Sequence, residues 1–275
     1  MGFLPTASLC PPALVGLAVA LALAMPTWGV SVLRRDASLA DRIWPWLIAG
    51  PGVAYAAHFS WSGSPLAWGL LAVLLAWALR LSLYLTWRNW GHGEDRRYQA
   101  MRQARGPAFV WQSAYVVFGL QAVIAWLVSF PLLVFFASGT EGGAGGAPGT
   151  AFAAVGGALA VFGVVFSAVA DWQLARFLRR RAPGAVLDHG LWAWSRHPNY
   201  FGEACLWWGL WLMALGAAGV AAWWTVLSPL LMTWLLLKVS GVVLLEQGMA
   251  ERRPAYRDYM ARTSAFVPRP PRRAL

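Results

Sequence analysis

The chain has 275 residues, of which 59% are hydrophobic and only 12% are charged. This composition excludes an ordinary soluble domain and indicates a polytopic membrane protein, with residues 1–275 forming a single membrane domain. The net charge of +11 would suggest a nucleic-acid partner in a soluble protein, but the arginines here gather between apolar runs, so we expect no nucleic-acid partner.

Seven apolar runs are long enough to cross a bilayer, which predicts an all-α fold with seven transmembrane helices. The runs are 12–33, 43–61, 66–87, 109–137, 151–177, 199–219 and 222–245. Arginines follow the odd-numbered runs, whereas the alternate loops at 62–65, 138–150 and 216–219 contain no lysine or arginine. By the positive-inside rule, the N-terminus is then outside and the C-terminus lies in the cytoplasm.

The third run ends with Arg80, Tyr84 and Arg88, which are spaced four apart and so share one helix face. Such a face is costly in lipid, so we expect it to point into the bundle or toward the headgroups. For Arg88 taken alone, a long side chain that extends to the membrane–water interface is a sufficient explanation. Arg80 lies two turns deeper, and we expect it to have a polar partner.

The loop that follows carries Glu94 and Asp95 before Arg97 and Tyr98. Acidic residues favour a helix start, so a short cytoplasmic helix is predicted here. An amphipathic surface helix without any ligand explains the same pattern equally well.

Polar residues also end the fifth and seventh runs. Asp171 precedes Arg176 and Arg179, and Glu246 follows the seventh run. Asp171 could form an ion pair or accept hydrogen bonds from a ribose or an amide. The C-terminal segment 251–268 is aromatic and patterned, and we expect it to fold back over the cytoplasmic mouth of the bundle.

The most informative stretch is 194–203, where Arg196, His197, Asn199, Tyr200 and Glu203 surround the start of the sixth run. Pro198 suits the first position of a helix, and a helix N-terminus beside basic side chains is a ready anion site. Asn199 and Glu203 share one face. The plainer interpretation is a membrane-helix entry with basic flanks, but a carboxylate inside the membrane favours a binding role.

These charges predict a polar cavity that opens to the cytoplasm and is surrounded by runs three, five, six and seven. Its walls would be rich in tryptophan, including Trp77 and Trp207. Arginines suit a phosphate, and aromatic walls suit a flat or lipidic molecule. A cytosolic cofactor would enter from below, and a lipophilic substrate would enter from the bilayer among the membrane lipids. Four scattered histidines form no ligand set, so no metal is expected.

Four segments together resemble a bacterial membrane-protein family of largely unknown function that is related to the steroid 5α-reductases. They are 88–98, 171–177, 195–203 and 263–268, and the resemblance covers about 66–271. It implies a protein of the bacterial inner membrane with seven helices and NADPH in a cytoplasmic cavity. Its activity would be NADPH-dependent reduction of a C=C bond in a steroid-like or other unsaturated lipid.

The resemblance implies a set of cofactor-binding residues, with Tyr84 also a possible proton donor. The whole set comprises Arg80, Tyr84, Arg88, Arg97, Tyr98, Asp171, Arg176, Arg179, Arg196, His197, Asn199, Tyr200, Glu203 and Glu246. The candidate substrate contacts are Trp77, Gly50 and Trp207. The second run lacks the Gln-Glu pair with which steroid reductases hold a keto oxygen, and Trp77 replaces their tyrosine. A 3-keto steroid substrate is therefore not expected.

Two alternatives remain open. Arg196–Tyr200 and 246–268 also resemble the isoprenylcysteine carboxyl methyltransferases, which implies an S-adenosylmethionine-dependent membrane methyltransferase. A non-enzymatic scaffold or lipid-binding protein is the third hypothesis. Buried Arg80, Asp171 and Glu203 argue against it, because ion pairs need not be kept merely for stability.

Overall fold

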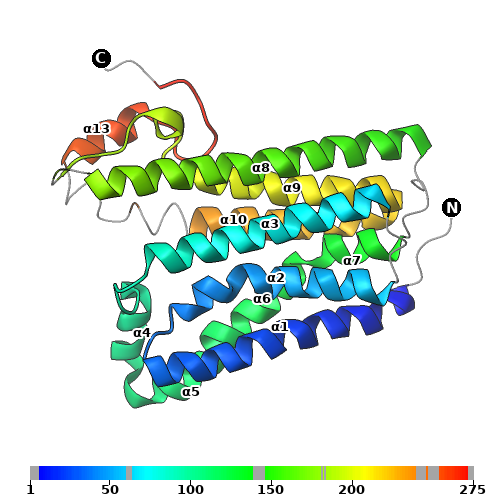
Figure 1. Cartoon of the computed structure of the whole chain (residues 1–275), viewed down its shortest axis with the longest axis horizontal. Helices are drawn as coiled ribbons and strands as arrows, with labels where there is room; N and C mark the ends of the chain where they lie inside the picture. Colours follow the sequence, from blue (N-terminus) through cyan, green and yellow to red (C-terminus); the bar gives the residue numbers. More distant parts are fainter. Residues whose placement is uncertain are drawn as a thin grey trace. The chain divides into compact units, whose positions relative to one another are not determined.

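A computed structural model describes residues 6–59, 64–138, 146–180, 182, 184–239, 246 and 254–271, and every regular element among them is helical (Figure 1). The N-terminal helices are α1 (Thr6–Arg34), α2 (Leu39–His58), α3 (Pro65–Arg88), α4 (Arg96–Arg105), η1 (Gly106–Ala108), α5 (Phe109–Ser113), η2 (Ala114–Gly119), α6 (Leu120–Val128) and α7 (Phe130–Ala137). The later helices are α8 (Gly146–Arg180), η3 (Gly190–Ala193), α9 (Pro198–Ala218), η4 (Gly219–Val226), α10 (Leu227–Trp234), η5 (Leu235–Val239) and α13 (Pro254–Arg262).

Five helical stretches among the described residues are long and apolar enough to cross a membrane. They are Leu9–Arg34, Pro65–Arg88, Arg96–Val128, Pro148–Arg180 and Pro198–Val239. The predicted all-helical fold is thus confirmed, with five candidate membrane spans among the described residues in place of the seven predicted. The second predicted run is the helix α2, which is not among the five, although nearly half of its residues are buried.

The last of these stretches is 42 residues long and doubles back on itself. The indole Nε1 of Trp208 in α9 donates a hydrogen bond of 3.2 Å to Thr233 Oγ1 in α10. In a straight helix, residues 25 apart would be separated by about 37 Å. The chain therefore turns between them, and η4 begins at Gly219 with a positive φ of 59°.

The chain divides into two compact units. Unit 1 comprises 1–154 and 211–228, and unit 2 comprises 155–210 and 229–275. In unit 1, α2 packs against α1, α3 and α6. The buried Tyr55 of α2 lies at the centre of this packing, with its hydroxyl 3.1 Å from Ser129 Oγ.

The predicted short helix after the third run is α4, and its start is fixed by acidic residues. Asp95 is its N-cap and accepts a 2.9 Å hydrogen bond from Arg97 N–H. Glu94 accepts from the backbone N–H of Ala37 at 2.9 Å and from Arg102 at 2.8 and 3.0 Å. These bonds tie α4 to the loop between α1 and α2.

In unit 2, α8 and α9 run antiparallel and approach closely at glycines. A Cβ on Gly202 would lie 2.7 Å from the carbonyl oxygen of Gly163, and a Cβ on Gly209 would lie 2.6 Å from that of Gly156. Small residues permit such backbone approach between membrane helices, where dispersion replaces the hydrophobic effect. Gly149 and Gly216 form an equivalent pair within unit 1.

Candidate functional site

Helix α9 begins at Pro198, as predicted, and the residues before it are held by the C-terminal segment. Ser195 Oγ accepts a hydrogen bond from His197 N–H at 3.1 Å and donates one to the carbonyl of Phe266 at 2.7 Å. The Arg196 N–H donates to the carbonyl of Ser264 at 2.8 Å. The C-terminal segment therefore does fold back onto Trp194–Arg196, and that it covers a cytoplasmic mouth stays a prediction.

The guanidinium of Arg196 is enclosed by acceptors from this tail. Its Nε and Nη2 donate to the two carboxylate oxygens of Glu246 at 2.7 and 2.9 Å. Its Nη1 donates to the carbonyls of Met260 and Thr263 at 3.0 and 2.7 Å. All three nitrogens therefore have protein acceptors, so Arg196 secures the tail and offers no open fork to an anion.

His197 completes the same cluster. Its Nε2 lies 2.9 Å from Glu246 Oε1, and the side chains of both residues are about one-tenth exposed or less. Burial disfavours the charged form of Glu246, but the hydrogen bonds from His197 and Arg196 outweigh burial and lower its pKa to about 2. The carboxylate therefore stays ionised at neutral pH and acts as the bridge between the tail and the start of α9.

A second polar group lies on the adjoining part of α8 and α9. Asn199 Nδ2 donates to Asp171 Oδ1 at 3.1 Å, and Asn199 Oδ1 accepts from Tyr200 N–H. Asp171 and Glu203 are only 5% and 8% exposed. The ring of Tyr200 stacks on that of His197, with centroids 5.6 Å apart. The structure thus brings together Asp171, Asn199, Tyr200 and His197 from the predicted set.

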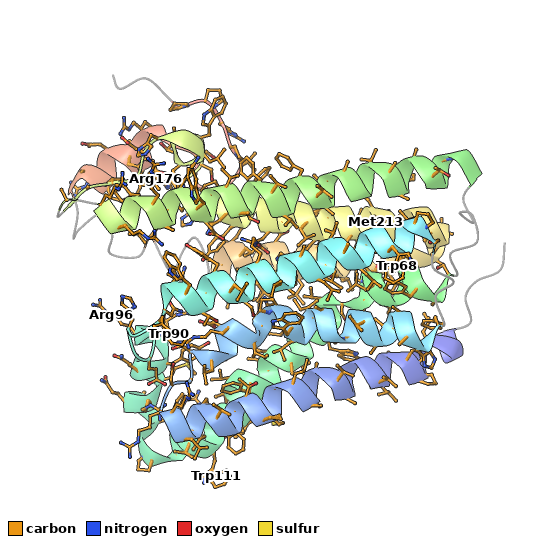
Figure 2. The ribbon with its side chains drawn as sticks, in the orientation of Figure 1. Trp68, Trp90, Arg96, Trp111, Arg176 and Met213 are labelled. Carbon is orange, nitrogen blue, oxygen red and sulfur yellow. The ribbon has the colours of Figure 1, made fainter. Side chains whose placement is uncertain are left out.

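Arg176 lies on a different face of α8 from Asp171. Its guanidinium lies 5.6 Å from the ring centroid of Trp172, and the two residues line a cavity of about 500 Å³ together with Gln173, Phe177, Arg180 and His189. Figure 2 shows Arg176 near the C-terminal end of α8. Arg179 lies on the same helical turn, with an exposed side chain.

The candidate residues of α3 belong to unit 1. Arg88 stacks over the Tyr84 ring at 5.6 Å and also donates to Asn89 Oδ1 at 3.3 Å. Arg80 is half-buried, and Trp77 is fully buried. Arg80, Tyr84 and Arg88 therefore follow one another at intervals of four residues within the one helix α3.

Two residues predicted to bind the cofactor have a structural partner that the sequence did not reveal. Arg97 Nη2 and the Tyr98 hydroxyl each donate to Asp41 at 2.7 Å. Asp41 lies in the first turn of α2, 56 residues before Arg97. An acidic residue among arginines was visible in the sequence. The sequence did not indicate which residues would bind it.

The candidate substrate contacts face the protein core. A Cβ on Gly50 would meet Leu23 and Val19 of α1 at 2.9 and 3.1 Å, so Gly50 permits α1 and α2 to pack. Trp207 is fully buried in α9. Among the described residues, no three histidine, cysteine, aspartate or glutamate side chains are grouped as a metal site would require.

Comparison with known proteins identifies the family. A family model described as "Protein of unknown function (DUF1295)" matches residues 27–263. The chain belongs to the DUF1295 family. It is also similar to the "Uncharacterized protein C594.04c" of Schizosaccharomyces pombe, with 26% identity over 295 residues that cover 94% of this chain and 80% of the yeast protein. No solved structure matches the chain.

Proposed function

We propose that this DUF1295 protein is an NADPH-dependent membrane reductase that reduces a C=C bond in a lipophilic, steroid-like or unsaturated lipid substrate. The observation that carries the proposal is the hydrogen bond between the buried Asp171 and the half-buried Asn199, with the buried Glu203 one turn further along α9. Buried carboxylates in membrane helices are costly, so they favour a binding role.

The donor set in unit 2 fits a nicotinamide dinucleotide in part. Carboxylates and an amide suit ribose hydroxyls and a carboxamide, which Asp171, Asn199 and Glu203 would supply. Arg176 and Arg180 at the end of α8 offer exposed guanidinium groups to phosphates. Arg196 does not fit this role, because Glu246 and two carbonyls already engage it.

The bound cofactor would supply the hydride, and the protein would orient it. Asp171 accepts a hydrogen bond from the Asn199 amide and so holds that side chain in one orientation. Tyr84 of α3 is the candidate proton donor, because its phenol is the acid that the resemblance assigns there. Arg80 and Arg88 are cofactor candidates through the same resemblance.

The finer topology belongs to this proposal. We infer seven transmembrane helices, with α2 as the second and with α9 and α10–η5 as the last two. The N-terminus would lie outside and the site would face the cytoplasm, in the inner membrane of a bacterium. A relation to the steroid 5α-reductases accounts for this arrangement and for the reductase activity.

A methyltransferase is the second candidate, and one observation favours it. The structure joins Arg196 to Glu246 and Ser195 to Phe266, the two segments that resemble the isoprenylcysteine methyltransferases. S-adenosylmethionine carries no phosphate, so this activity would not depend on the arginines of α8. A scaffold without a nucleotide site is the third candidate.

Thermal unfolding of the detergent-purified protein with NADPH, NADH or S-adenosylmethionine tests these proposals. A ligand at about 100 times its Kd adds roughly 2.7 kcal/mol to the stability of the folded state. We expect NADPH alone to raise the unfolding midpoint, and Asp171→Asn to abolish this shift. Asp258→Asn, an exposed site in α13, is the matched control and should keep it.

The other outcomes are equally informative. Stabilisation by S-adenosylmethionine alone would replace the reductase with the methyltransferase. No shift with any ligand, in detergent and in lipid nanodiscs, would favour the scaffold. If Asp171→Asn lowers the midpoint without ligand, NADPH fluorescence on binding to the folded fraction separates lost binding from lost folding.

A further inference from the structure

The end of α1 carries an unusual residue for its conformation. Asp36 N–H bonds to the Ser31 carbonyl at 3.0 Å and Arg35 N–H to that of Val32 at 3.2 Å, which is the Schellman pattern of helix termination. Arg35 occupies the position that glycine normally fills, with φ of +51°, and is the only non-glycine residue with positive φ in the described chain. Left-handed backbone is unfavourable for a residue with a Cβ. The presence of arginine at this position therefore points to a role for its side chain.

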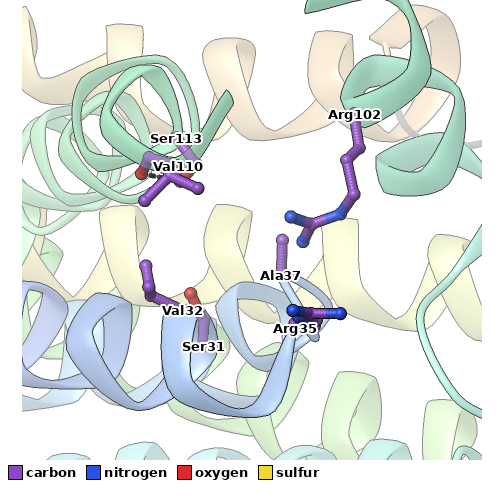
Figure 3. Close-up of a pocket in the computed structure, with 7 residues that line it drawn as sticks. All are labelled: Ser31, Val32, Arg35, Ala37, Arg102, Val110 and Ser113. Carbon is purple, nitrogen blue, oxygen red and sulfur yellow. Dashed lines mark hydrogen bonds between the residues drawn. The ribbon is translucent and has the colours of Figure 1, made fainter. Parts of the chain in front are cut away.

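That side chain lines a small cavity in unit 1. The cavity has a volume of about 270 Å³ and is bounded by Ser31, Val32, Arg35, Ala37, Arg102, Val110 and Ser113. Figure 3 shows the guanidinium groups of Arg35 and Arg102 on one side of this space, across from Val110 and Ser113. Two like charges that share a cavity favour an anion between them.

The hydrogen-bond donors that remain at the cavity are cationic. Ser31 Oγ already donates to the Trp28 carbonyl and Ser113 Oγ to the Val110 carbonyl, both at less than 3 Å. Arg102 uses Nε and Nη2 for Glu94 and lies over the Phe109 ring, which leaves Nη1 without a hydrogen-bond acceptor in the described part of the chain. Arg35 forms no side-chain hydrogen bond or ion pair there. An anion in the cavity would therefore contact the whole guanidinium of Arg35 and the Nη1 of Arg102.

The position of the cavity indicates the source of the anion. The membrane-crossing stretch Leu9–Arg34 ends one residue before Arg35. Leu33 and Trp111 beside the cavity are 85% and 71% exposed, and Figure 2 shows Trp111 pointing away from the helices. Exposed tryptophan and leucine at the end of a membrane helix lie among headgroups and upper acyl chains. A cavity this small is below the range of about 300–1,000 Å³ that is typical for drug-sized ligands.

We propose that this cavity binds the phosphate of an anionic phospholipid headgroup, with Arg35 as the principal contact and Arg102 as the second. The acyl chains would lie against Leu33 and Trp111. The site is separate from the NADPH proposal, because none of the residues that line the cavity belongs to the candidate cofactor set. The proposal predicts that an anionic lipid stabilises the end of α1 and the loop between α1 and α2.

The test uses the full-length protein in a neutral detergent, titrated with phosphatidylglycerol, phosphatidylcholine or inorganic phosphate. Unfolding midpoints and the number of retained lipids in native mass spectra are measured. We expect phosphatidylglycerol alone to raise the midpoint. Arg35→Gly should weaken this binding roughly tenfold, because a charge-assisted phosphate contact is lost. Without lipid, Arg35→Gly should be as stable as the parent or more so, because glycine suits the left-handed position.

Arg34→Gln is the matched control, since it removes a neighbouring positive charge outside the cavity, and it should keep the lipid shift. Arg35→Lys should retain part of it. Equal lipid binding by Arg35→Gly and the parent, or equal losses in Arg34→Gln and Arg35→Gly, would overturn the proposal. An Arg35-dependent shift with inorganic phosphate but not with the lipid would assign the site to a soluble anion instead.

Discussion

At the scale of single residues, Glu246 decides how the C-terminal segment is attached. Its carboxylate bridges Arg196 and His197, and its side chain is only 11% exposed. A folded pKa of about 2, against an ordinary value of 4.5, means that its ionised form stabilises the fold above pH 4.5. This contribution is lost as the pH falls from 4.5 toward 2.

We therefore predict that Glu246→Gln lowers stability at pH 7 by about 3 kcal/mol at most, the size of such a pKa shift. The difference between parent and variant should shrink as the pH is lowered from 5 toward 3, because the parent loses what the variant already lacks. Unfolding midpoints measured across this range check the prediction. Asp258→Asn removes the same charge from the tail and should leave the unfolding midpoint and its pH dependence unchanged. An undiminished difference at pH 3 would contradict it.

At the same scale, the sequence revealed residues but not their partners. Arg196, His197 and Glu246 were all in the predicted cofactor-binding set, and they do meet, but they bind one another and the tail instead of a phosphate. The acceptors of Arg196 lie 50 to 67 residues later, and two are backbone carbonyls of no distinctive residue type. Such contacts depend on how the tail folds back, and no local pattern encodes them. Asp171 and Asn199 were both in the predicted set and lie near the ends of the fifth and sixth apolar runs, but the bond between them was not predicted.

At the scale of elements, a glycine period sets the spacing of α8 and α9. Gly149, Gly156 and Gly163 pair with Gly216, Gly209 and Gly202 in antiparallel order, and both series repeat every seven residues. The sequence analysis did not use this spacing, and the structure shows that it permits the close packing of two helices. The apolar runs predicted most helices and the break at Gly219, which falls in the predicted loop 216–219. The break at Ser129 depends on a local turn that hydropathy does not detect.

We predict that Gly202→Ala and Gly209→Ala each destabilise the protein. A new Cβ would lie within 2.7 Å of backbone atoms of α8, which cannot move independently. Overpacking of this kind costs about 1–3 kcal/mol. Gly69→Ala in α3 is the control, because nothing lies within 4 Å of its Cβ position and alanine favours a helix by about 0.5–1 kcal/mol. Unfolding midpoints in one detergent compare the three, and a neutral Gly202→Ala would contradict close packing.

At the scale of the whole molecule, the arginine distribution and the reversal after α9 make a joint prediction about the membrane. The Trp208–Thr233 bond shows that the chain turns back, and Val220 in η4 is 80% exposed at that turn. In the proposed topology, the positive-inside rule would put this turn outside and the arginine-rich tail inside. The two positions should therefore lie on opposite sides of the membrane.

We predict that a cysteine at Val220 reacts with a membrane-impermeant maleimide in intact cells, whereas a cysteine at Arg257 reacts only after the membrane is opened. The background carries Cys10→Ser and Cys205→Ser, which removes both native thiols. Arg257 suits the comparison because it is exposed in α13. If both sites were labelled in intact cells, or both only after the membrane is opened, the two positions would lie on the same side. The predicted membrane crossing between them would then be wrong. Protection of Val220 in every condition would instead place the turn within the bilayer, and the seven-helix topology would then be wrong.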